Sequence, residues 1–371
     1  MIPLFKVAMS ESAAGAVADV LASGSVGQGP LVKRFEQALA ERLGNHRVVT
    51  VNSATAGLHL ALRLVTDEPG QAPGEVLSTP LTFEATNFAV LANRLPIRWV
   101  DVDPQTLNVD LDDLARKITP ATRAIMIVHF AGFPVDLARL SRILDDAEAA
   151  YGVRPVVIED CAHAWGATYQ GVPLGNHGNI SVFSFQAIKH LTCVDGGLLV
   201  LPEDGWHRRA RLLRWFGIDR EADRLRKAPE VDEWGYKFHM NDVNAAIGLA
   251  NLARVDEIVA RHRANAAFYD RALAGAPGLE IIRRSEHHSP SYWVYPLRVQ
   301  NRNAFVKRMD EAGIAVSQVH ERNDRHPCVR QYRALLPGMD RVAEELICIP
   351  VGWWLSERDR QHVADVIRAG W

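Results

Sequence analysis

The feature that most restricts the fold of this chain is an alternation of short apolar runs with amphipathic helical patterns, from about residue 32 to residue 201. Continuous apolar runs without polar alternation are typical of strands that are buried on both faces. Strands that alternate with helices predict an α/β fold with a mostly parallel sheet covered by helices. The expected strands are residues 48–51, 75–78, 97–100, 125–128, 156–158, 180–185 and 197–201, and the expected helices are residues 32–43, 54–65, 86–92 and 137–150.

The pattern changes after this alternating region. A long helical stretch covers about residues 241–274, and an α+β tail follows, with a strand within 292–299 and a helix at 357–369. A chain of 371 residues is long enough for two domains. We therefore expect a large domain over residues 1–245 and a smaller C-terminal α+β domain over residues 246–371.

Composition excludes several classes of partner. The formal net charge is −2, so we expect no broad attraction to nucleic acid or to an anionic membrane. The N-terminus lacks the apolar core of a signal peptide, and no apolar run is long enough to span a bilayer. The four cysteines show no CxxC pair or other metal spacing, so we expect reduced thiols, a cytoplasmic protein and no metal site.

Two reactive side chains follow neighbouring strands of the expected sheet. The run 156–158 leads into Glu159 and Asp160, and Lys189 comes shortly after the run 180–185. Ligands of parallel α/β sheets bind at this carboxyl edge. Burial there lowers the pKa of a lysine, as a Schiff-base lysine requires, and a buried aspartate can keep a pyridine nitrogen protonated. Taken alone, each residue is a weak signal.

Three segments together carry a specific resemblance. Residues 159–167 read EDCAHAWGA, residues 184–189 read SFQAIK, and residues 195–197 read DGG. This series resembles the sugar aminotransferases of the DegT–StrS type, which are fold-type I pyridoxal-phosphate enzymes. Their pattern is E-D-x-A-[HQ]-A-x-G-A, then S-F-x-x-x-K, then an acidic residue and two glycines. The resemblance covers nearly the whole chain and fades toward the C-terminus.

The resemblance implies a role for each matching residue. Lys189 would form the Schiff base with pyridoxal 5'-phosphate and move the proton between substrate carbon and cofactor. Asp160 would pair with the pyridinium nitrogen, and His163 would lie beside the ring and its phenolic oxygen. Ser184 would contact the phosphate.

Two upstream segments extend the resemblance. Residues 52–58, NSATAGL, lead from a strand into a helix, and a helix start with small hydroxyl residues can bind an anion. The matching S-x-T-A turn of the family holds the cofactor phosphate, which implies Ala54 and Thr55 here. Residues 80–86, PLTFEAT, resemble the family's P-x-T-[FW]-x-A-T, in which the position of Phe83 stacks on the ring. Gly57, inside the expected helix, has no functional explanation from the sequence.

A further segment, GYKFHMND at residues 235–242, aligns with the family's G-Y-N-Y-R-[ML]-x-[DE]. The residue after the tyrosine, here Lys237, reaches the partner's cofactor phosphate in the family, which implies a homodimer with shared active sites. Asn is common at that position, and Arg is common where this chain has His239.

Substrate contacts are implied in two places. The loop 24–30, with Gln28, fits the family's loop before the first long helix, near the substrate. The charged cluster 319–327 stands where the family often has Y-x-x-P-x-H, so we assign His320 and Arg322 to the substrate. The guanidinium of Arg322 could form a two-pronged bond with a carboxylate or phosphate.

The resulting interpretation is an aminotransferase that moves an amino group from L-glutamate to a keto-sugar. A nucleotide-linked keto-deoxysugar, in surface-glycan or natural-product sugar biosynthesis, is the family default. An eight-carbon keto-ulosonic acid that meets Arg322 is an alternative. A family dehydratase would have His in place of Lys189, and a non-catalytic cofactor-binding regulator would need a nucleic-acid-binding module for which the chain has no spare length.

Overall fold

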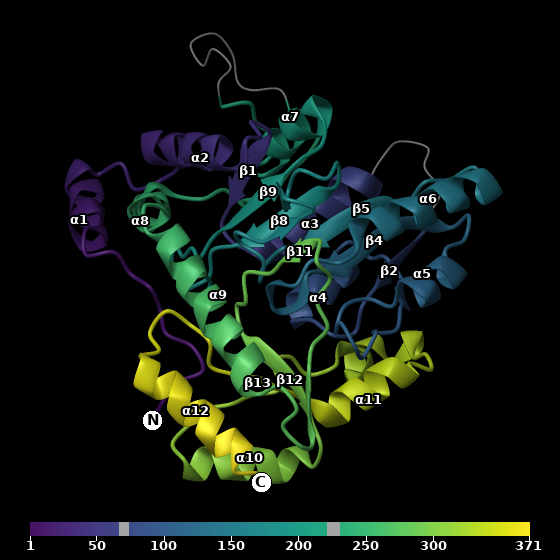
Figure 1. Cartoon of the computed structure of the whole chain (residues 1–371). Coiled ribbons are helices and arrows are strands. Elements are labelled where there is room, and N and C mark those ends of the chain that lie inside the picture. Colours follow the sequence, from purple (N-terminus) through teal and green to yellow (C-terminus); the bar gives the residue numbers. More distant parts are fainter. Residues whose placement is uncertain (67–73, 221–230) are drawn as a thin grey trace.

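A seven-stranded sheet is the centre of the larger part of the molecule (Figure 1). The computed structural model describes residues 1–66, 74–220 and 231–371. All neighbouring strands are parallel except β9, which runs antiparallel to both β1 and β8. The predicted mostly parallel sheet is confirmed. The strand order is β1 (Val48–Val51), β9 (Gly197–Val200), β8 (Ile180–Ser184), β5 (Val156–Asp160), β4 (Thr122–Val128), β2 (Glu75–Ser78) and β3 (Ile97–Trp99).

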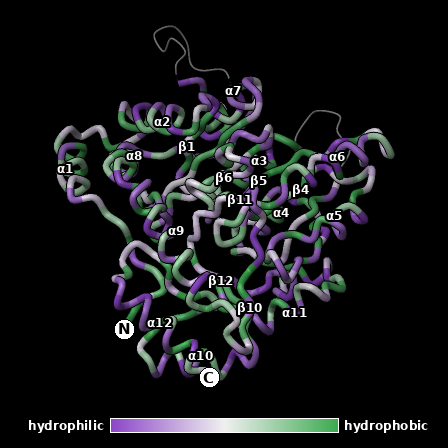
Figure 2. The backbone as a smooth tube through the Cα atoms, viewed as in Figure 1, coloured by the Kyte–Doolittle hydropathy of each residue, from purple (hydrophilic) through white to green (hydrophobic). Residues whose placement is uncertain are grey.

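Helices cover both faces of this sheet, as the apolar strands require. In β4, Ala124 and Met126 pack into one apolar cluster, and Ile125 and Ile127 pack into another on the opposite face. The strands accordingly form a hydrophobic interior beneath more polar helices (Figure 2). One face carries α3 (Ala54–Thr66), α4 (Glu84–Ala92) and α7 (Asp204–Leu213); the other carries α2 (Pro30–Leu43), α5 (Leu111–Lys117), α6 (Leu137–Tyr151), α8 (Asp242–Leu252) and the first half of α9 (Val255–Ala272).

Close packing of α3 explains Gly57. A Cβ atom on Gly57 would lie 2.8 Å from a methyl of Val182 and 3.2 Å from a methyl of Leu199. The missing side chain therefore lets α3 approach β8 and β9, which fixes the start of α3 at the carboxyl edge of the sheet. The role of this glycine is packing.

The C-terminal part has its own antiparallel sheet, β10 (Leu279–Ile281), β12 (Tyr295–Val299) and β13 (Leu346–Ile349). Both chain termini lie at this end of the molecule (Figure 1). The strand expected from residue 292 begins at Tyr295 because Tyr292 has a φ of 55°, outside the β region. The accompanying elements are α10 (Arg302–Glu311), the short 3₁₀ turns Asn323–Arg325 and Pro327–Tyr332, α11 (Pro337–Glu345) and α12 (Glu357–Arg368).

Three further elements complete the described chain. They are the N-terminal helix α1 (Ala13–Ser23), the short 3₁₀ turn Phe130–Gly132, and a small sheet of β11 (His288–Ser289), β6 (Thr168–Tyr169) and β7 (Val172–Pro173). The expected domain boundary at residue 245 falls inside α8, which packs against α1 and α2, and it stays a prediction.

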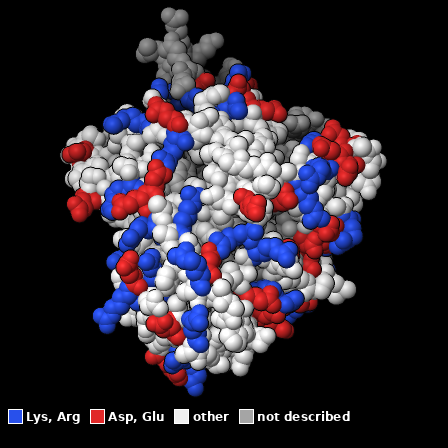
Figure 3. Space-filling view, in the orientation of Figure 1, with Lys and Arg blue, Asp and Glu red and all other residues white. Residues whose placement is uncertain are grey.

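Charged side chains of both signs are interspersed on the face seen in Figure 3. This face shows no extended field of one sign among its described residues, in keeping with the net charge of −2. Within the described ranges, no helix is both long and apolar enough to cross a membrane.

The carboxylate of Asp242 holds the start of α2. It accepts hydrogen bonds from the backbone N–H groups of Gly29, Leu31 and Val32, at 2.9, 3.2 and 3.0 Å. We expect Asp242→Ala to lower the free energy of unfolding by about 2–3 kcal/mol, because it leaves N–H groups of a helix start without an acceptor. Chemical denaturation followed by circular dichroism measures the change.

The matched control is Asp146→Ala, since Asp146 is an exposed residue of α6. We expect it to change stability by less than about 0.5 kcal/mol. If both variants behaved alike, the cap formed by Asp242 would not be a major contribution to stability.

Candidate active site

The carboxyl ends of the parallel strands line one cavity of about 340 Å³. Strand β9 is antiparallel, so Asp195 and Gly196, which precede it, lie at the same edge. The remaining lining residues follow β1, β2, β4, β5 and β8, or come from the C-terminal half of the chain. They are Ser53, Ala54, Thr55, Leu58, Thr82, Phe83, Ala85, Thr86, Val128, Asp160, Ala162, His163, Ser184, Gln186, Ile188, Lys189, Trp293 and His320.

Lys189 is the amine of this cavity. It follows β8 in a tight turn in which its backbone N–H donates to the carbonyl of Gln186, at 2.9 Å. Burial lowers the pKa of its ammonium group to about 7, and the nearby Asp160 opposes the shift. Near neutral pH, Lys189 is therefore divided between the ammonium and the nucleophilic amine.

Asp160 is the buried carboxyl group of this cavity, at the end of β5. Its carboxylate accepts a hydrogen bond from the Thr86 hydroxyl at 2.7 Å and one from the backbone N–H of Ala162 at 3.0 Å. The Thr86 hydroxyl uses its hydrogen atom in the bond to Asp160. In the hydrogen bond between the hydroxyls of Thr82 and Thr86, which are 2.7 Å apart, Thr82 is therefore the donor. Burial raises the pKa of Asp160 despite these bonds. A cationic partner inside the cavity would therefore stabilise the charged form of this carboxyl group.

His163 is a buried and uncharged imidazole. Burial, with Lys189 nearby, holds its pKa well below the usual range. Its Nδ1 accepts from the backbone N–H of Ala131 at 3.3 Å, which assigns the ring proton to Nε2. That proton faces Nε2 of His320, 3.4 Å away. Burial also lowers the pKa of His320, to about 3, so the two rings share a hydrogen bond as neutral groups.

The start of α3 and the end of β8 meet at one end of the cavity. Ala54 and Thr55 are the first residues of α3, where backbone N–H groups have no acceptor inside the helix. Ser184 ends β8 and also lines the cavity. A Cβ atom on Gly197 would lie 2.7 Å from the backbone nitrogen of Ala54, so the glycine allows β9 to approach the helix start. This arrangement can hold an anion.

Phe83 and His320 lie together on the cavity wall. Their ring centroids are 5.4 Å apart, and 55% of the Phe83 surface is exposed. His320 comes from the C-terminal part of the chain, so the cavity is bounded by both parts of the molecule. An exposed aromatic ring at such a place is available to a planar ligand.

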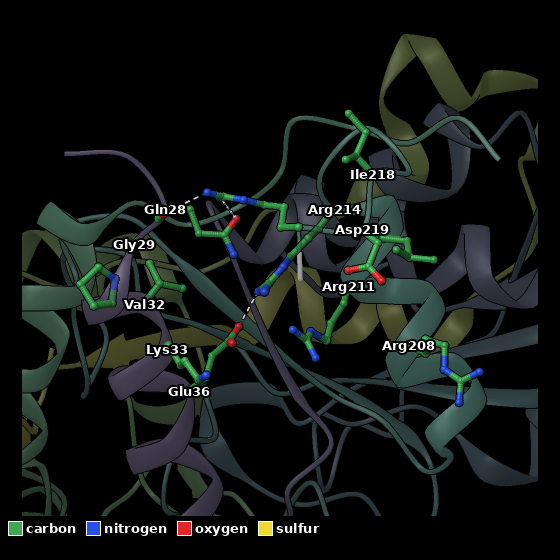
Figure 4. A pocket seen from close by; sticks show the side chains of 13 residues that line it. Gln28, Gly29, Val32, Lys33, Glu36, Arg208, Arg211, Arg214, Ile218 and Asp219 are labelled. Carbon is green, nitrogen blue, oxygen red and sulfur yellow. Dashed lines mark hydrogen bonds and ion pairs between the residues drawn. The ribbon is translucent and has the colours of Figure 1, made fainter. Parts of the chain in front are cut away.

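Gln28 does not line this cavity. It borders a separate cavity of about 500 Å³ between the loop before α2 and the end of α7 (Figure 4). There its side-chain oxygen accepts a hydrogen bond from Arg220 at 2.8 Å. On the same wall, Arg214 forms an ion pair with Glu36. The structure therefore separates Gln28 from the residues predicted to hold the cofactor.

Two other predicted residues also lie outside the Lys189 cavity. Arg322 forms a two-pronged ion pair with Asp324, with both bonds at 2.8 Å, and a further ion pair with Asp340. Its guanidinium is therefore already used by the protein. Lys237 pairs with Trp215 through an isolated backbone bridge, and its carbonyl accepts from the side chain of Asn52 at 3.4 Å.

Thr86 and Trp293 line the cavity, although no role was predicted for them from the sequence. Thr86 stands within the PLTFEAT motif, and its spacing of three residues from Phe83 could have placed it on the same first turn of α4. Trp293 had no comparable signal, because it precedes a strand that begins more than a hundred residues after Lys189.

The neighbours of Asp160 in the chain, Glu159 and Cys161, form a buried cluster with His129. The atoms of these three side chains that could bind a metal ion lie within 4.8 Å of one another. Hydrogen bonds account for two of these side chains. His129 accepts from the backbone N–H of Val135 at Nδ1 and donates from Nε2 to Glu159, at 3.0 and 2.8 Å. The second Glu159 oxygen accepts from the side chain of Asn179 at 2.7 Å. The cluster supports the end of β5.

Known proteins are similar to this chain in sequence and fold. The model of the DegT/DnrJ/EryC1/StrS aminotransferase family matches residues 7–368. AtS13 from Actinomadura melliaura is 61% identical with a TM-score of 0.97, and the similarity covers 100% of this chain and 99% of that chain. The sugar aminotransferase CalS13 from Micromonospora echinospora is 58% identical with a TM-score of 0.97, over 100% of both chains.

A more distant structure is that of DesV from S. venezuelae in complex with a ketimine intermediate. It is 27% identical, with a TM-score of 0.87, over 96% of this chain and 94% of that chain. The predicted fold-type I architecture is confirmed by these matches. The chain belongs to the DegT/DnrJ/EryC1/StrS family and is a pyridoxal-phosphate-dependent sugar aminotransferase.

Proposed function

We propose that this enzyme transfers the amino group of L-glutamate to the ketone carbon of a nucleotide-linked keto-deoxysugar, in surface-glycan or natural-product sugar biosynthesis. The observation that carries the proposal is the pair of Lys189 and Asp160 in one cavity. Burial there lowers the pKa of Lys189 to about 7 and raises that of Asp160. An amine that is free near neutral pH can attack a carbonyl and then carry a proton.

The cavity fits pyridoxal 5'-phosphate. Asp160 can pair with the ring nitrogen, and the start of α3 with Ala54, Thr55 and Ser184 can hold the phosphate. Phe83 and His163 can bound the ring. The cofactor supplies a carbonyl that bonds the amine and a ring that accepts electrons.

Lys189 is the group that moves the proton at the substrate carbon. Its amine needs a pKa near the working pH, and burial provides this. The neutral His163 and His320 add no positive charge beside it, so they do not hinder its protonation as cations would. We therefore assign acid–base catalysis to Lys189.

We propose His320 and Phe83 as the residues that the sugar meets first, because they form the wall contributed by both parts of the chain. The alternative of an eight-carbon keto-ulosonic acid depended on a free Arg322, whose guanidinium is held by Asp324 and Asp340. The nucleotide-linked sugar is therefore the better-supported substrate class. The side chain of Gln28 lines a separate cavity, so Gln28 could contribute to the substrate site only by the position of its loop.

We propose a homodimer in which Lys237 of one chain reaches the cofactor phosphate of the other. In support, Lys189 is the one Lys or Arg side chain among the described residues that line the cavity, and a phosphate dianion gains from a second cation. Lys237 lies outside its own chain's cavity. We also propose a cytoplasmic location, in line with four free cysteines, three of them buried.

Absorbance spectra of the purified enzyme test the proposed reaction. Glutamate should remove the absorbance of the lysine-linked cofactor and release 2-oxoglutarate. A nucleotide-linked 4-keto-6-deoxyhexose should then restore the absorbance and appear as the amino sugar in mass spectrometry. Restoration only by keto-sugars that carry no nucleotide would contradict the assigned substrate class. An unchanged spectrum with every amino acid would contradict the reaction itself.

A further inference from the structure

The ring of Trp293 lies directly against the amine of Lys189. The Lys189 Nζ atom is 3.5 Å from the centroid of the Trp293 ring, and both residues line the cavity. We propose that Trp293 is a positioning residue, whose indole face receives the Lys189 amine whenever that amine is not bonded to the cofactor. The inference rests on the proposed function, in which Lys189 must leave the cofactor and return to it.

The indole itself is fixed at three points. Its Nε1–H donates to the carbonyl of Ile188 at 2.9 Å, so it is bonded to the residue next to Lys189 in the chain. The backbone N–H of Trp293 donates to the carbonyl of Ala131 at 3.0 Å. The ring stacks on His163, with centroids 4.0 Å apart and planes inclined by 16°. Trp293 is 3% exposed, so this position is enforced by packing as well as by hydrogen bonds.

The two residues before Trp293 are held just as firmly. His190 donates to the carbonyl of Ser291 at 3.1 Å, and His262 donates to the carbonyl of Tyr292 at 2.7 Å. Burial keeps the pKa of both histidines low, so they act as neutral donors. The backbone of Ser291 also donates to Gly132 at 3.1 Å. Through these bonds, the buried side chains of His190 and His262 hold the segment 291–293 against the cavity.

A second aromatic ring supports the indole. Phe5 stacks on Trp293 with centroids 4.9 Å apart and planes inclined by 26°. Phe5 belongs to the N-terminal segment, in which Ile2 pairs with Ile314 of the C-terminal part. The indole is therefore backed by a ring of the N-terminal segment, which is itself paired with the C-terminal part. A rigid aromatic face is a favourable site for an ammonium group.

A pair of substitutions distinguishes the effect of the aromatic face on Lys189 from the effects of the hydrogen bond to Ile188 and of the volume of the side chain. Trp293→Phe and Trp293→Leu both lose the bond to Ile188 and both enlarge the cavity, but only phenylalanine keeps an aromatic face. Competitive labelling of the full-length, cofactor-free protein with acetic anhydride, read by mass spectrometry of the Lys189 peptide, gives the titration midpoint of this amine. We expect the wild-type midpoint near 7. The leucine variant should titrate about 0.5–1 pH unit below the phenylalanine variant.

The second readout is the glutamate half-reaction of the cofactor-loaded enzyme. We expect Trp293→Leu to lower its maximal rate constant by about 10- to 100-fold, with the glutamate concentration at half-maximal rate changed by less than about 3-fold. Trp293→Phe should recover most of the rate. The matched control is Trp353→Leu, because Trp353 lies 5.5 Å from the Lys6 amine and does not line the cavity.

Two results would overturn the inference. One is an equal titration midpoint in the phenylalanine and leucine variants, and the other is an equal loss of rate in both. A wild-type enzyme that fails to react with any amino acid would instead remove the proposed function. The labelling comparison would still decide whether the indole holds the amine, because it needs neither cofactor nor substrate.

Discussion

Lys189→Ala should lower the rate of amino transfer by more than about 10⁴-fold, because it removes both the amine that bonds the cofactor and the group that moves the proton. Burial lowers the pKa of this amine to about 7, and the other Lys and Arg residues of the described chain lie outside the cavity. No other described Lys or Arg side chain of the same chain therefore lines the cavity to replace it. Steady-state release of 2-oxoglutarate measures the loss, and borohydride reduction of the loaded enzyme tests for the lysine-linked cofactor.

Lys307→Ala is the control for this substitution. Lys307 is 79% exposed on α10, and its loss should change neither rate nor cofactor attachment. Retention of more than about 1% of wild-type activity by Lys189→Ala would contradict the assignment of Lys189.

Asp160→Asn should lower the maximal rate by about 10²- to 10³-fold. The change preserves shape. The amide oxygen can still accept from the backbone N–H of Ala162, and the amide NH2 can donate to the Thr86 hydroxyl, so the fold should survive. An amide cannot carry the negative charge that pairs with a protonated ring nitrogen. The charge of Asp160 also raises the pKa of Lys189, so the labelling midpoint of Lys189 should fall in this variant.

Single-turnover absorbance with glutamate and the Lys189 titration together measure these effects. Asp146→Asn, an exposed substitution on α6, is the control and should leave both unchanged. A normal rate in Asp160→Asn would show that the reaction does not need a charged carboxylate at this position.

Most of the larger fold could be predicted from local sequence patterns. The strands β1 and β2 span the predicted residues 48–51 and 75–78, since helices cover both faces of the sheet and nearly all residues of these strands are buried. The helices α5 and α10 were not predicted, because short helices with many charged residues give a weak apolar period. The C-terminal antiparallel sheet depends on pairing between β10, β12 and β13, which are distant in the sequence.

The grouping of the candidate site could be predicted where one segment carries several of the residues that line the cavity. Lys189, Asp160, His163 and Ser184 lie in one cavity because parallel strands bring their carboxyl ends to the same edge. Gln28 and Arg322 show the limit of this reasoning. Sequence position places a side chain near a region, but local partners decide whether it is free, and both residues are bonded to other parts of the protein.

The bonds around the segment 291–293 have a consequence for protein engineering. Carbonyl and N–H groups of this segment are matched to residues 131, 132, 190 and 262, whereas β12 begins only at Tyr295. A chimera that takes its acceptor-recognition elements from another family member should therefore be joined after Trp293. With a junction inside α8, the segment 291–293 would come from the other protein and would have to form the same hydrogen bonds beside Lys189. A junction after Trp293 would exchange β12 and β13 of the C-terminal sheet and keep β10, while every bond that holds the segment 291–293 beside the lysine stays native.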